Sequence, residues 1–423
     1  MTPPLVIDNV DLCRMVTCGS VDDGKSTLIG RLLYDSKQVM ADQLEHIEEV
    51  SERRGDGYVN LALLTDGLRA EREQGITIDV AYRPFATPHR RFIIADCPGH
   101  VQYTRNMATG ASTADVAVVL IDARHGVVEQ TRRHTYVCAQ LRIPRVVVAI
   151  NKMDLVDFSQ ERFAEIEAQY RAFADELDIA IDLIPISALD GDNVVDPSTR
   201  MDWYAGPPLL THLEQIPLDR EQVGVPARFA VQWVIRPQAT EYHDYRGYGG
   251  QIASGEFRPG MEVLVLPAGH RTTIAHVETI DGQLEVAEAP RSVTIRLADN
   301  LDVARGDMIV GVESAPAVAR ELVADICWMN ERPLAAGARY VIRHTTREAR
   351  AVVDAIEHRL NVETFASDAA DTLGLNDLGR IRLRISQPLV VDGYRDNRTT
   401  GSFILIDEST NDTLGAGMIV SAQ

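Results

Sequence analysis

One octapeptide constrains the fold of this chain more than any other feature. Residues 19–26 read Gly-Ser-Val-Asp-Asp-Gly-Lys-Ser and match the pattern GxxxxGK[ST]. A short apolar run at 15–18 precedes it, and a helix-like segment at 26–34 follows it. Glycines in this setting let the backbone wrap around a phosphate chain, so that N–H groups and the helix N-terminus face the negative charge. The context favours a phosphate-binding loop over a plain glycine turn.

The pattern around this loop predicts an α/β domain. Apolar runs without period-two alternation occur at 92–95, 116–121, 146–150 and 183–186, with helix-like segments at 130–141 and 159–176 between them. Such runs are typical of strands buried on both faces of a parallel sheet. We therefore expect a doubly wound sheet with its ligand loops at the carboxyl ends of the strands.

The second half of the chain has a different pattern. From Ala227 onward, short alternating strands are separated by glycine and proline turns, as in a small antiparallel barrel. A second all-β stretch starts near Glu321 and continues to the C-terminus. We predict an α/β P-loop GTPase domain over 1–220, followed by two small antiparallel β-barrel domains over 221–318 and 319–423.

Composition excludes several classes of protein. No apolar run approaches the ~20 residues of a membrane span, and residues 1–14 do not read as a signal peptide. The five cysteines form no CxxC pair, which suits a reducing cytoplasm and argues against a zinc site. The net charge of −20 disfavours DNA as a partner.

The phosphate loop supplies most of the expected nucleotide contacts. Lys25 is expected to reach the β- and γ-phosphates and to act in catalysis, and the Ser26 hydroxyl to ligate Mg²⁺. For Asp22, a monovalent-cation role and a turn role like that of a helix N-cap stay open. The predicted binding residues of this loop are Gly19, Ser20, Val21, Asp22, Asp23, Gly24, Lys25, Ser26 and Thr27.

A second loop follows the apolar run at 92–95. The carboxylate of Asp96 is suited to hold the Mg²⁺ shell, and the Gly99 N–H to meet the γ-phosphate. Thr77 precedes this strand in a long loop and is expected to close on Mg²⁺ when γ-phosphate is present. Its alternative is an ordinary β-branched strand residue, and the sequence does not decide between the two.

The base is specified by Asn151-Lys152-Met153-Asp154, which follows the run at 146–150. Guanine presents an N1–H and an exocyclic amine side by side, and the Asp154 carboxylate can accept both hydrogen bonds. Adenine has no such donor pair and would leave that carboxylate unpaired. The Lys152 stem can cover a ring face, and Ser187, Ala188 and Leu189 are placed to complete the pocket, with the Ala188 N–H facing the base.

His100 directly follows Gly99. GTP hydrolysis depends on positioning and electrostatics more than on covalent chemistry, so one well-placed imidazole is sufficient to orient the attacking water. The alternative is a polar residue that only supports its neighbours. We favour the water-orienting role and expect that His100→Ala abolishes hydrolysis while sparing GTP binding.

These motifs, followed by two β domains, resemble the translation-factor class of GTPases. Within that class the chain is similar to the large, GTPase subunits of bacterial sulfate adenylyltransferase. Ser20 and Asp23 stand where the elongation factors carry histidines in the P-loop. The similarity to the sulfate adenylyltransferase subunits rests on the segments 34–37, 65–74, 102–113, 343–346 and 400–407.

The resemblance implies a function in sulfate activation. In that family ATP and sulfate give adenosine 5′-phosphosulfate and pyrophosphate in a separate small catalytic subunit, and GTP hydrolysis drives this unfavourable reaction forward. It implies GTP, Mg²⁺ and that subunit as partners. No second GxxxxGK[ST] follows residue 26, so we expect no fused adenylylsulfate kinase in this chain. A ribosome-bound, RNA-binding switch is the alternative, but RNA is not the favoured partner; a free-standing GTPase with an unrelated partner is more remote.

Overall fold

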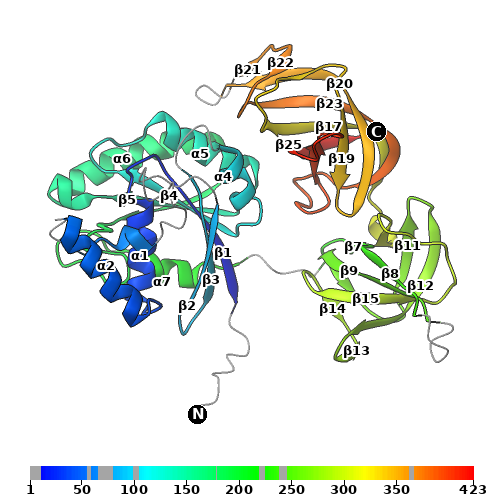
Figure 1. Ribbon diagram of the computed structural model, residues 1–423, viewed down its shortest axis with the longest axis horizontal. Coiled ribbons are helices and arrows are strands. Elements are labelled where there is room, and N and C mark those ends of the chain that lie inside the picture. Colours follow the sequence, from blue (N-terminus) through cyan, green and yellow to red (C-terminus); the bar gives the residue numbers. More distant parts are fainter. Residues whose placement is uncertain are drawn as a thin grey trace. The chain divides into compact units, whose positions relative to one another are not determined.

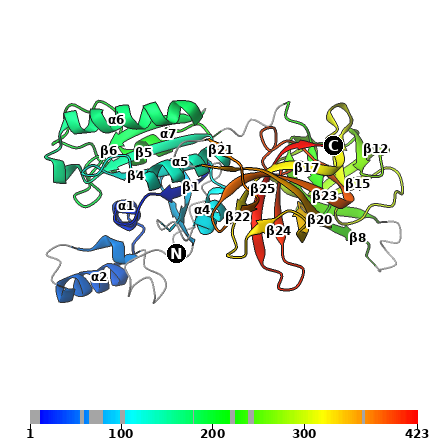
Figure 2. The ribbon, with the colours of Figure 1, turned by 90° about the horizontal axis from the view of Figure 1, so that it is seen from above.

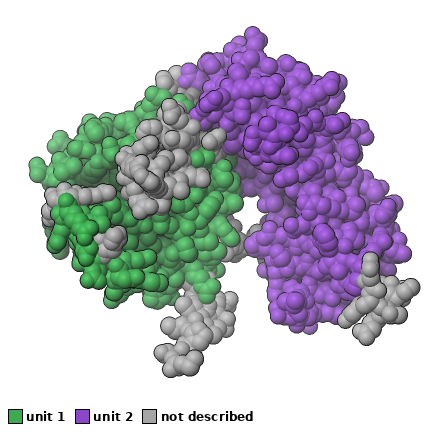
Figure 3. Space-filling view, in the orientation of Figure 1, with its two compact units in different colours: residues 1–219 green, residues 220–423 purple. Residues whose placement is uncertain are grey.

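The computed structural model describes residues 11–54, 59–64, 80–98, 104–177, 179–218, 224–237, 245–361 and 366–423. The chain divides into two units, residues 1–219 and 220–423, coloured separately in Figure 3. Within the described residues, no helix is both long and apolar enough to span a membrane. All five cysteines are described, and each is a free, buried thiol.

The first unit is built on a six-stranded sheet with the order β2-β3-β1-β4-β5-β6. Strands β3, β1, β4, β5 and β6 pair in parallel, and β2 pairs with β3 in antiparallel fashion. The carboxyl ends of the five parallel strands therefore meet at one edge of the sheet. The strands are β1 (Leu12–Cys18), β2 (Ala81–Ala86), β3 (Arg91–Asp96), β4 (Val116–Asp122), β5 (Arg145–Asn151) and β6 (Ala180–Pro185).

Helices cover both faces of this sheet, as Figure 1 shows. Helices α1 and α7 pack on one face, where α1 contributes Leu28, Ile29 and Leu32 to the core. Helices α4 and α5 lie on the other face, with α6 beside α5. The helices are α1 (Lys25–Asp35), α2 (Ala41–Arg54), α4 (Thr104–Ala111), α5 (Glu129–Gln140), α6 (Gln160–Ala174) and α7 (Leu209–Gln215).

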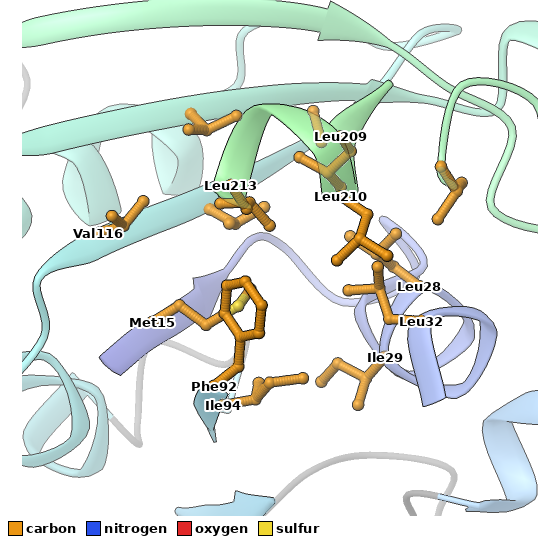
Figure 4. Packing of buried hydrophobic residues seen from close by; sticks show 14 of the residues in the cluster. Met15, Leu28, Ile29, Leu32, Phe92, Ile94, Val116, Leu209, Leu210 and Leu213 are labelled. Atoms are coloured by element: carbon orange, nitrogen blue, oxygen red, sulfur yellow. The ribbon is translucent and has the colours of Figure 1, made fainter. Parts of the chain in front are cut away.

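Figure 4 shows the core between the sheet and helices α1 and α7. Met15 of β1 and Phe92 of β3 face the α1 leucines, and Leu213 of α7 closes the cluster from above the sheet. All of these side chains are almost fully buried. Burying side chains of this kind contributes roughly 1.5–3 kcal/mol each, so the cluster fixes the direction in which α1 leaves the phosphate loop.

The edge strand β2 was missed in the sequence. Its tyrosine, Tyr82, is 54% exposed, and Pro84 stands in its interior. Proline removes a ladder hydrogen bond and argues against a central strand, but an edge strand tolerates it. The five apolar runs correspond to the five parallel strands, so the predicted α/β core is confirmed with this antiparallel addition.

The second unit begins with a closed six-stranded antiparallel barrel. Its strands pair in the order β11-β16-β7-β9-β15-β12, and β12 closes onto β11. Val231 and Gln232 separate the short strands β7 and β8, both of which pair with β9. The barrel strands are β7 (Arg228–Ala230), β9 (Gly247–Ser254), β11 (Glu262–Leu266), β12 (His270–Thr279), β15 (Ser292–Leu297) and β16 (Met308–Gly311); the smaller strands are β8 (Trp233–Ile235), β10 (Glu256–Phe257), β13 (Gly282–Leu284) and β14 (Ala287–Glu288).

A second closed barrel follows, in the order β19-β24-β25-β17-β23-β20, and β20 closes onto β19. Figure 2 shows β17, β20, β23 and β25 in this barrel. Its strands are β17 (Ala317–Trp328), β19 (Arg339–His344), β20 (Arg347–Leu360), β23 (Leu378–Val391), β24 (Ser402–Ile406) and β25 (Thr413–Ala422), with the short β18 (Leu334–Ala335), β21 (Ser367–Asp368) and β22 (Thr372–Leu373) beside them. The predicted fold class, an α/β domain and two antiparallel barrels, is confirmed. The division of the second unit at 318 and 319 stays a prediction.

Buried polar contacts join the two barrels within the second unit. Arg228 of β7 is 2% exposed, and its guanidinium makes two hydrogen bonds of 2.9 Å to the carboxylate of Asp392. Thr400 Oγ1 donates to the same carboxylate at 2.6 Å, and Asn397 Nδ2 donates to Ser254 Oγ at 2.8 Å. These bonds satisfy a charge that would otherwise be buried at high cost.

Candidate functional site

The candidate site lies at the carboxyl edge of the parallel sheet. Strand β1 ends in the phosphate loop, and β3 ends at Asp96. Strand β4 ends at Asp122 and β5 at Asn151, which are paired in register, and Ser187 follows β6. The strand order therefore brings together loops that lie far apart in the sequence.

The backbone of the phosphate loop depends on glycine at position 24. Gly24 caps α1 in the left-handed region with φ +93°. A Cβ at this position would lie 2.4 Å from Asn151 Nδ2. Only glycine meets both demands without strain, so its place in the motif is explained by the close approach of the β5 loop.

Lys25 lies buried across this loop. Its Nζ donates to the carbonyl oxygens of Gly19 at 2.8 Å and Ser20 at 2.7 Å. Burial lowers the pKa of Lys25, and the carboxylates of Asp23 and Asp96 oppose that shift. The ammonium is thus positioned at the mouth of the loop, where a phosphate chain would lie.

Asp23, and not Asp22, makes the side-chain contact that closes this turn. The Asp23 carboxylate accepts the Ser20 N–H at 2.5 Å and closes the loop on itself. Burial raises the pKa of Asp23, and Lys25 opposes the rise. Asp22 is exposed with φ +67°, and Gly24 rather than Asp22 caps the helix.

Asn151 connects the phosphate loop to the loop after β6. Its Nδ2 donates to the Asp23 carbonyl at 2.8 Å, and its Oδ1 accepts the Ala188 N–H at 2.9 Å. The side chain is 2% exposed. A buried amide that uses both ends in this way fixes the spacing of the two loops.

Asp154 and Ser187 face each other in the predicted base pocket. Ser187 Oγ donates to Asp154 Oδ1 at 2.7 Å and accepts the Asp190 N–H at 3.3 Å. This leaves the half-buried carboxylate oriented and able to accept further hydrogen bonds. Ala188 is buried with its N–H donated to Asn151, and Leu189 is 40% exposed.

Asp96 and Ser26 offer a suitable donor set for Mg²⁺. Asp96 is 1% exposed at the end of β3, and Thr17 Oγ1 lies 3.5 Å from its Oδ1. Ser26 and Thr27 lie in the first turn of α1, both partly exposed. A carboxylate and a hydroxyl beside a phosphate loop are the oxygen ligands that a magnesium–nucleotide site uses.

Comparisons with known proteins identify the family of this chain. The family described as Elongation factor Tu GTP binding domain matches residues 11–220, and the GTP-eEF1A C-terminal domain-like family matches residues 321–420. The sulfate adenylyltransferase subunit 1 of Laribacter hongkongensis is 52% identical over 417 residues, which cover 98% of this chain and 86% of that protein. The chain belongs to the sulfate adenylyltransferase subunit 1 family. It therefore carries a GTP-binding domain of the elongation factor Tu type in an enzyme subunit.

Other relatives differ in length. The bifunctional enzyme CysN/CysC of Mycobacterium tuberculosis (strain H37Rv) is 53% identical over 412 residues, which cover 97% of this chain and 67% of that protein. A solved structure of Sup35 complexed with GDP shares 23% identity with this chain, covering all of it and 97% of that chain, at a TM-score of 0.44.

Three predicted residues of the subunit 1 site lie outside the described part of the chain. They are Thr77, Gly99 and His100, and the segment 65–74 used for the resemblance lies there as well. The roles proposed for them in closing on Mg²⁺, sensing γ-phosphate and orienting water stay predictions.

One charged group at this sheet edge is absent from the predicted site residues. Asp122 ends β4 and is 2% exposed, and its carboxylate contacts Arg124 at 2.6 Å and Lys152 at 2.9 Å. The position of this carboxylate directly after a fully apolar run could have predicted its place in the site, because the carboxyl ends of the parallel strands meet at the same sheet edge as the motifs. Asp122 belongs to none of the GTP-binding motifs, so no motif predicts it.

Proposed function

We propose that this chain is the GTPase subunit of a sulfate adenylyltransferase, in which GTP hydrolysis drives ATP and sulfate to adenosine 5′-phosphosulfate and pyrophosphate. The observation that carries the proposal is the family membership at 52% identity over 98% of the chain. The adenylyl transfer takes place in a separate small subunit in this proposal. The free, buried cysteines are consistent with a reaction in the cytoplasm.

The base pocket supports guanine over adenine. Asp154, oriented by Ser187, accepts the N1–H and the exocyclic amine of guanine, and an adenine would leave the carboxylate without donors. Lys152 covers one face of the ring. Asn151 acts indirectly, because it holds the phosphate and base loops at a fixed distance.

The phosphate loop supports binding of a triphosphate. Backbone N–H groups between Gly19 and Lys25 surround the phosphates, and the Lys25 ammonium neutralises charge on the β- and γ-phosphates. Mg²⁺ held by Ser26 and Asp96, with Thr77, would neutralise the remaining phosphate charge. His100 orients the attacking water, so that the protein supplies position and electrostatics rather than a covalent intermediate.

Coupling to the partner follows from the chemistry of the product. A phosphosulfate anhydride lies uphill from ATP and sulfate, so its formation requires a second, favourable reaction. A switch that differs between GTP and GDP provides the link, since Thr77 and Gly99 contact the γ-phosphate only before hydrolysis. The partner subunit would respond to the state of that switch.

The experiment is to measure GTP turnover by the purified chain with and without a small sulfate adenylyltransferase subunit, in the presence of ATP and sulfate. We expect turnover to rise when all three are present, and Lys25→Ala to abolish the rise. His100→Ala should abolish turnover while leaving GTP binding intact.

Two outcomes would contradict the proposal. If turnover ignores the small subunit but increases with ribosomes, the GTPase assignment stands and the sulfate assignment falls. If GTP and ATP bind with equal affinity, the reading of Asp154 as the base-selecting residue also falls.

A further inference from the structure

The buried carboxylate of Asp122 lies at the carboxyl edge of the parallel sheet, where the candidate site is found. Asp122 is the last residue of β4, is paired in register with Asn151 of β5, and is 2% exposed. The Ala123 N–H donates to the Asn151 carbonyl at 2.8 Å, which continues the pairing one residue past the strand. Asp122 is therefore fixed on a rigid element beside the base loop.

Three donor groups surround this carboxylate. The Arg124 backbone N–H donates to Oδ1 at 2.9 Å, and its guanidinium donates to Oδ2 at 2.6 Å. Lys152 Nζ contacts Oδ2 at 2.9 Å, and His125 Nδ1 lies 3.7 Å from the same oxygen. Burial alone would raise the pKa of Asp122, but the bonds from Arg124 and Lys152 outweigh it and hold the pKa well below its ordinary value.

Lys152 is held from two sides. Besides the Asp122 carboxylate, its Nζ donates to the carbonyl oxygen of Asp22 in the phosphate loop. Its backbone lies in the left-handed region at φ +64°. A lysine stem is normally mobile, so two anchors at its tip restrict it to the path between β4 and the phosphate loop.

We propose that Asp122 is a positioning residue of the guanine site, which preorganises the Lys152 side chain so that its stem lies ready against the base. This inference rests on the proposed binding of guanine nucleotides. Without Asp122 the nucleotide itself would have to immobilise the lysine, which weakens binding. Arg124 also interacts electrostatically with Asp154 and Asp22, so the same carboxylate orders a second cation near the base loop.

The test is a double-mutant cycle on GDP affinity, measured with the purified chain. We expect Asp122→Asn to weaken GDP binding about tenfold in the native background, since one ordered side chain is lost. In the Lys152→Ala background the same change should alter the affinity less than about twofold, because there is no lysine left to position. Asp115→Asn, one residue before the start of β4, is the control and should leave the affinity unchanged.

Equal weakening in both backgrounds would overturn the proposal, since Asp122 would then act independently of Lys152. An unchanged GDP affinity in a folded Asp122→Asn variant would overturn it as well. Thermal unfolding of each variant checks that the fold is retained.

A second measurement requires no nucleotide. The chain has three lysines, of which Lys25 is buried and Lys37 is exposed. Acetylation followed by mass spectrometry should modify Lys152 more slowly than Lys37, and Asp122→Asn should remove the difference. If Lys152 and Lys37 react equally fast in the native chain, the two-sided anchor does not exist. If Lys152 of the native protein is acetylated more slowly than Lys37 but the protein binds no GDP, the proposed function is wrong, whereas the two-sided anchoring of Lys152 is supported.

Discussion

Single side chains set the spacing of the candidate site. Asn151 touches the phosphate loop with one end and the Ala188 N–H with the other, and Gly24 leaves the room that this contact requires. The carboxylate of Asp154, the proposed base-selecting group, is oriented by Ser187. In this proposal the choice of base depends on a few oriented groups rather than on the size of a pocket.

Replacing Asp154 with Asn should change the preferred base. The amide offers one acceptor and one donor, whereas guanine requires two acceptors, so GDP affinity should fall about a hundredfold or more. Xanthine carries a carbonyl in place of the guanine amine and should bind the variant better than guanine does. Equilibrium binding of GDP and XDP measures both changes. Asp202→Asn, at an exposed position of the same unit, should leave both affinities unchanged.

A buried histidine predicts an acid sensitivity. His134 of α5 is 1% exposed, and burial, with the charges of Lys25 and Arg133, lowers its pKa to about 3. In the unfolded chain a histidine titrates near pH ~6.5. Between these values the unfolded chain binds the proton and the folded chain does not, so stability is complete above ~6.5 and falls as the pH drops.

The expected loss is up to about 1.4 kcal/mol per pH unit below ~6.5. His134→Gln should flatten that dependence of the urea midpoint between pH 7 and pH 5. The control is His125→Gln, whose side chain is 64% exposed and should keep the native slope. A native slope in His134→Gln would contradict the argument.

At the scale of elements, a helix or strand was predictable where a local sequence pattern alone determines its secondary structure. The five apolar runs correspond to the parallel strands, and the runs in β4 and β5 are buried along their whole length. Strand β2 was missed because it is half exposed and contains Pro84.

The loops of the site were predictable because their motifs are local. The contact of Asp122 with Lys152 was not, since it depends on the register of β4 and β5. Nothing in the sequence near Asp122 states that Lys152 lies beside it. Thr77, Gly99 and His100 stay predictions.

Two ion pairs of equal length in the barrels should contribute differently to the free energy of unfolding, because one is buried and the other is exposed. Arg228 and Asp392 join the barrels at 2.9 Å with 3% and 13% side-chain exposure, whereas Arg382 and Glu357 lie at 2.9 Å with 52% and 29%. Asp392→Ala leaves a buried guanidinium unpaired and should cost about 3–5 kcal/mol. Glu357→Ala should cost less than about 1 kcal/mol. Urea unfolding of the two variants compares them, and similar losses would contradict the burial argument.

On the scale of the whole molecule, the chain combines a GTP-binding domain with two barrels that share buried polar contacts. The site described lies entirely in the first unit. In the proposed function the state of the nucleotide is transmitted to a partner subunit, and GTP hydrolysis, rather than GTP binding, drives formation of the product.

The most direct test is the amount of adenosine 5′-phosphosulfate that the complex of this chain with a small subunit accumulates at fixed ATP and sulfate. It is measured without guanine nucleotide, with GTP, and with a GTP analogue whose β–γ bond resists hydrolysis. We predict that GTP raises the product above the plateau reached without it, and that the analogue does not. The same plateau under all three conditions would contradict the coupling.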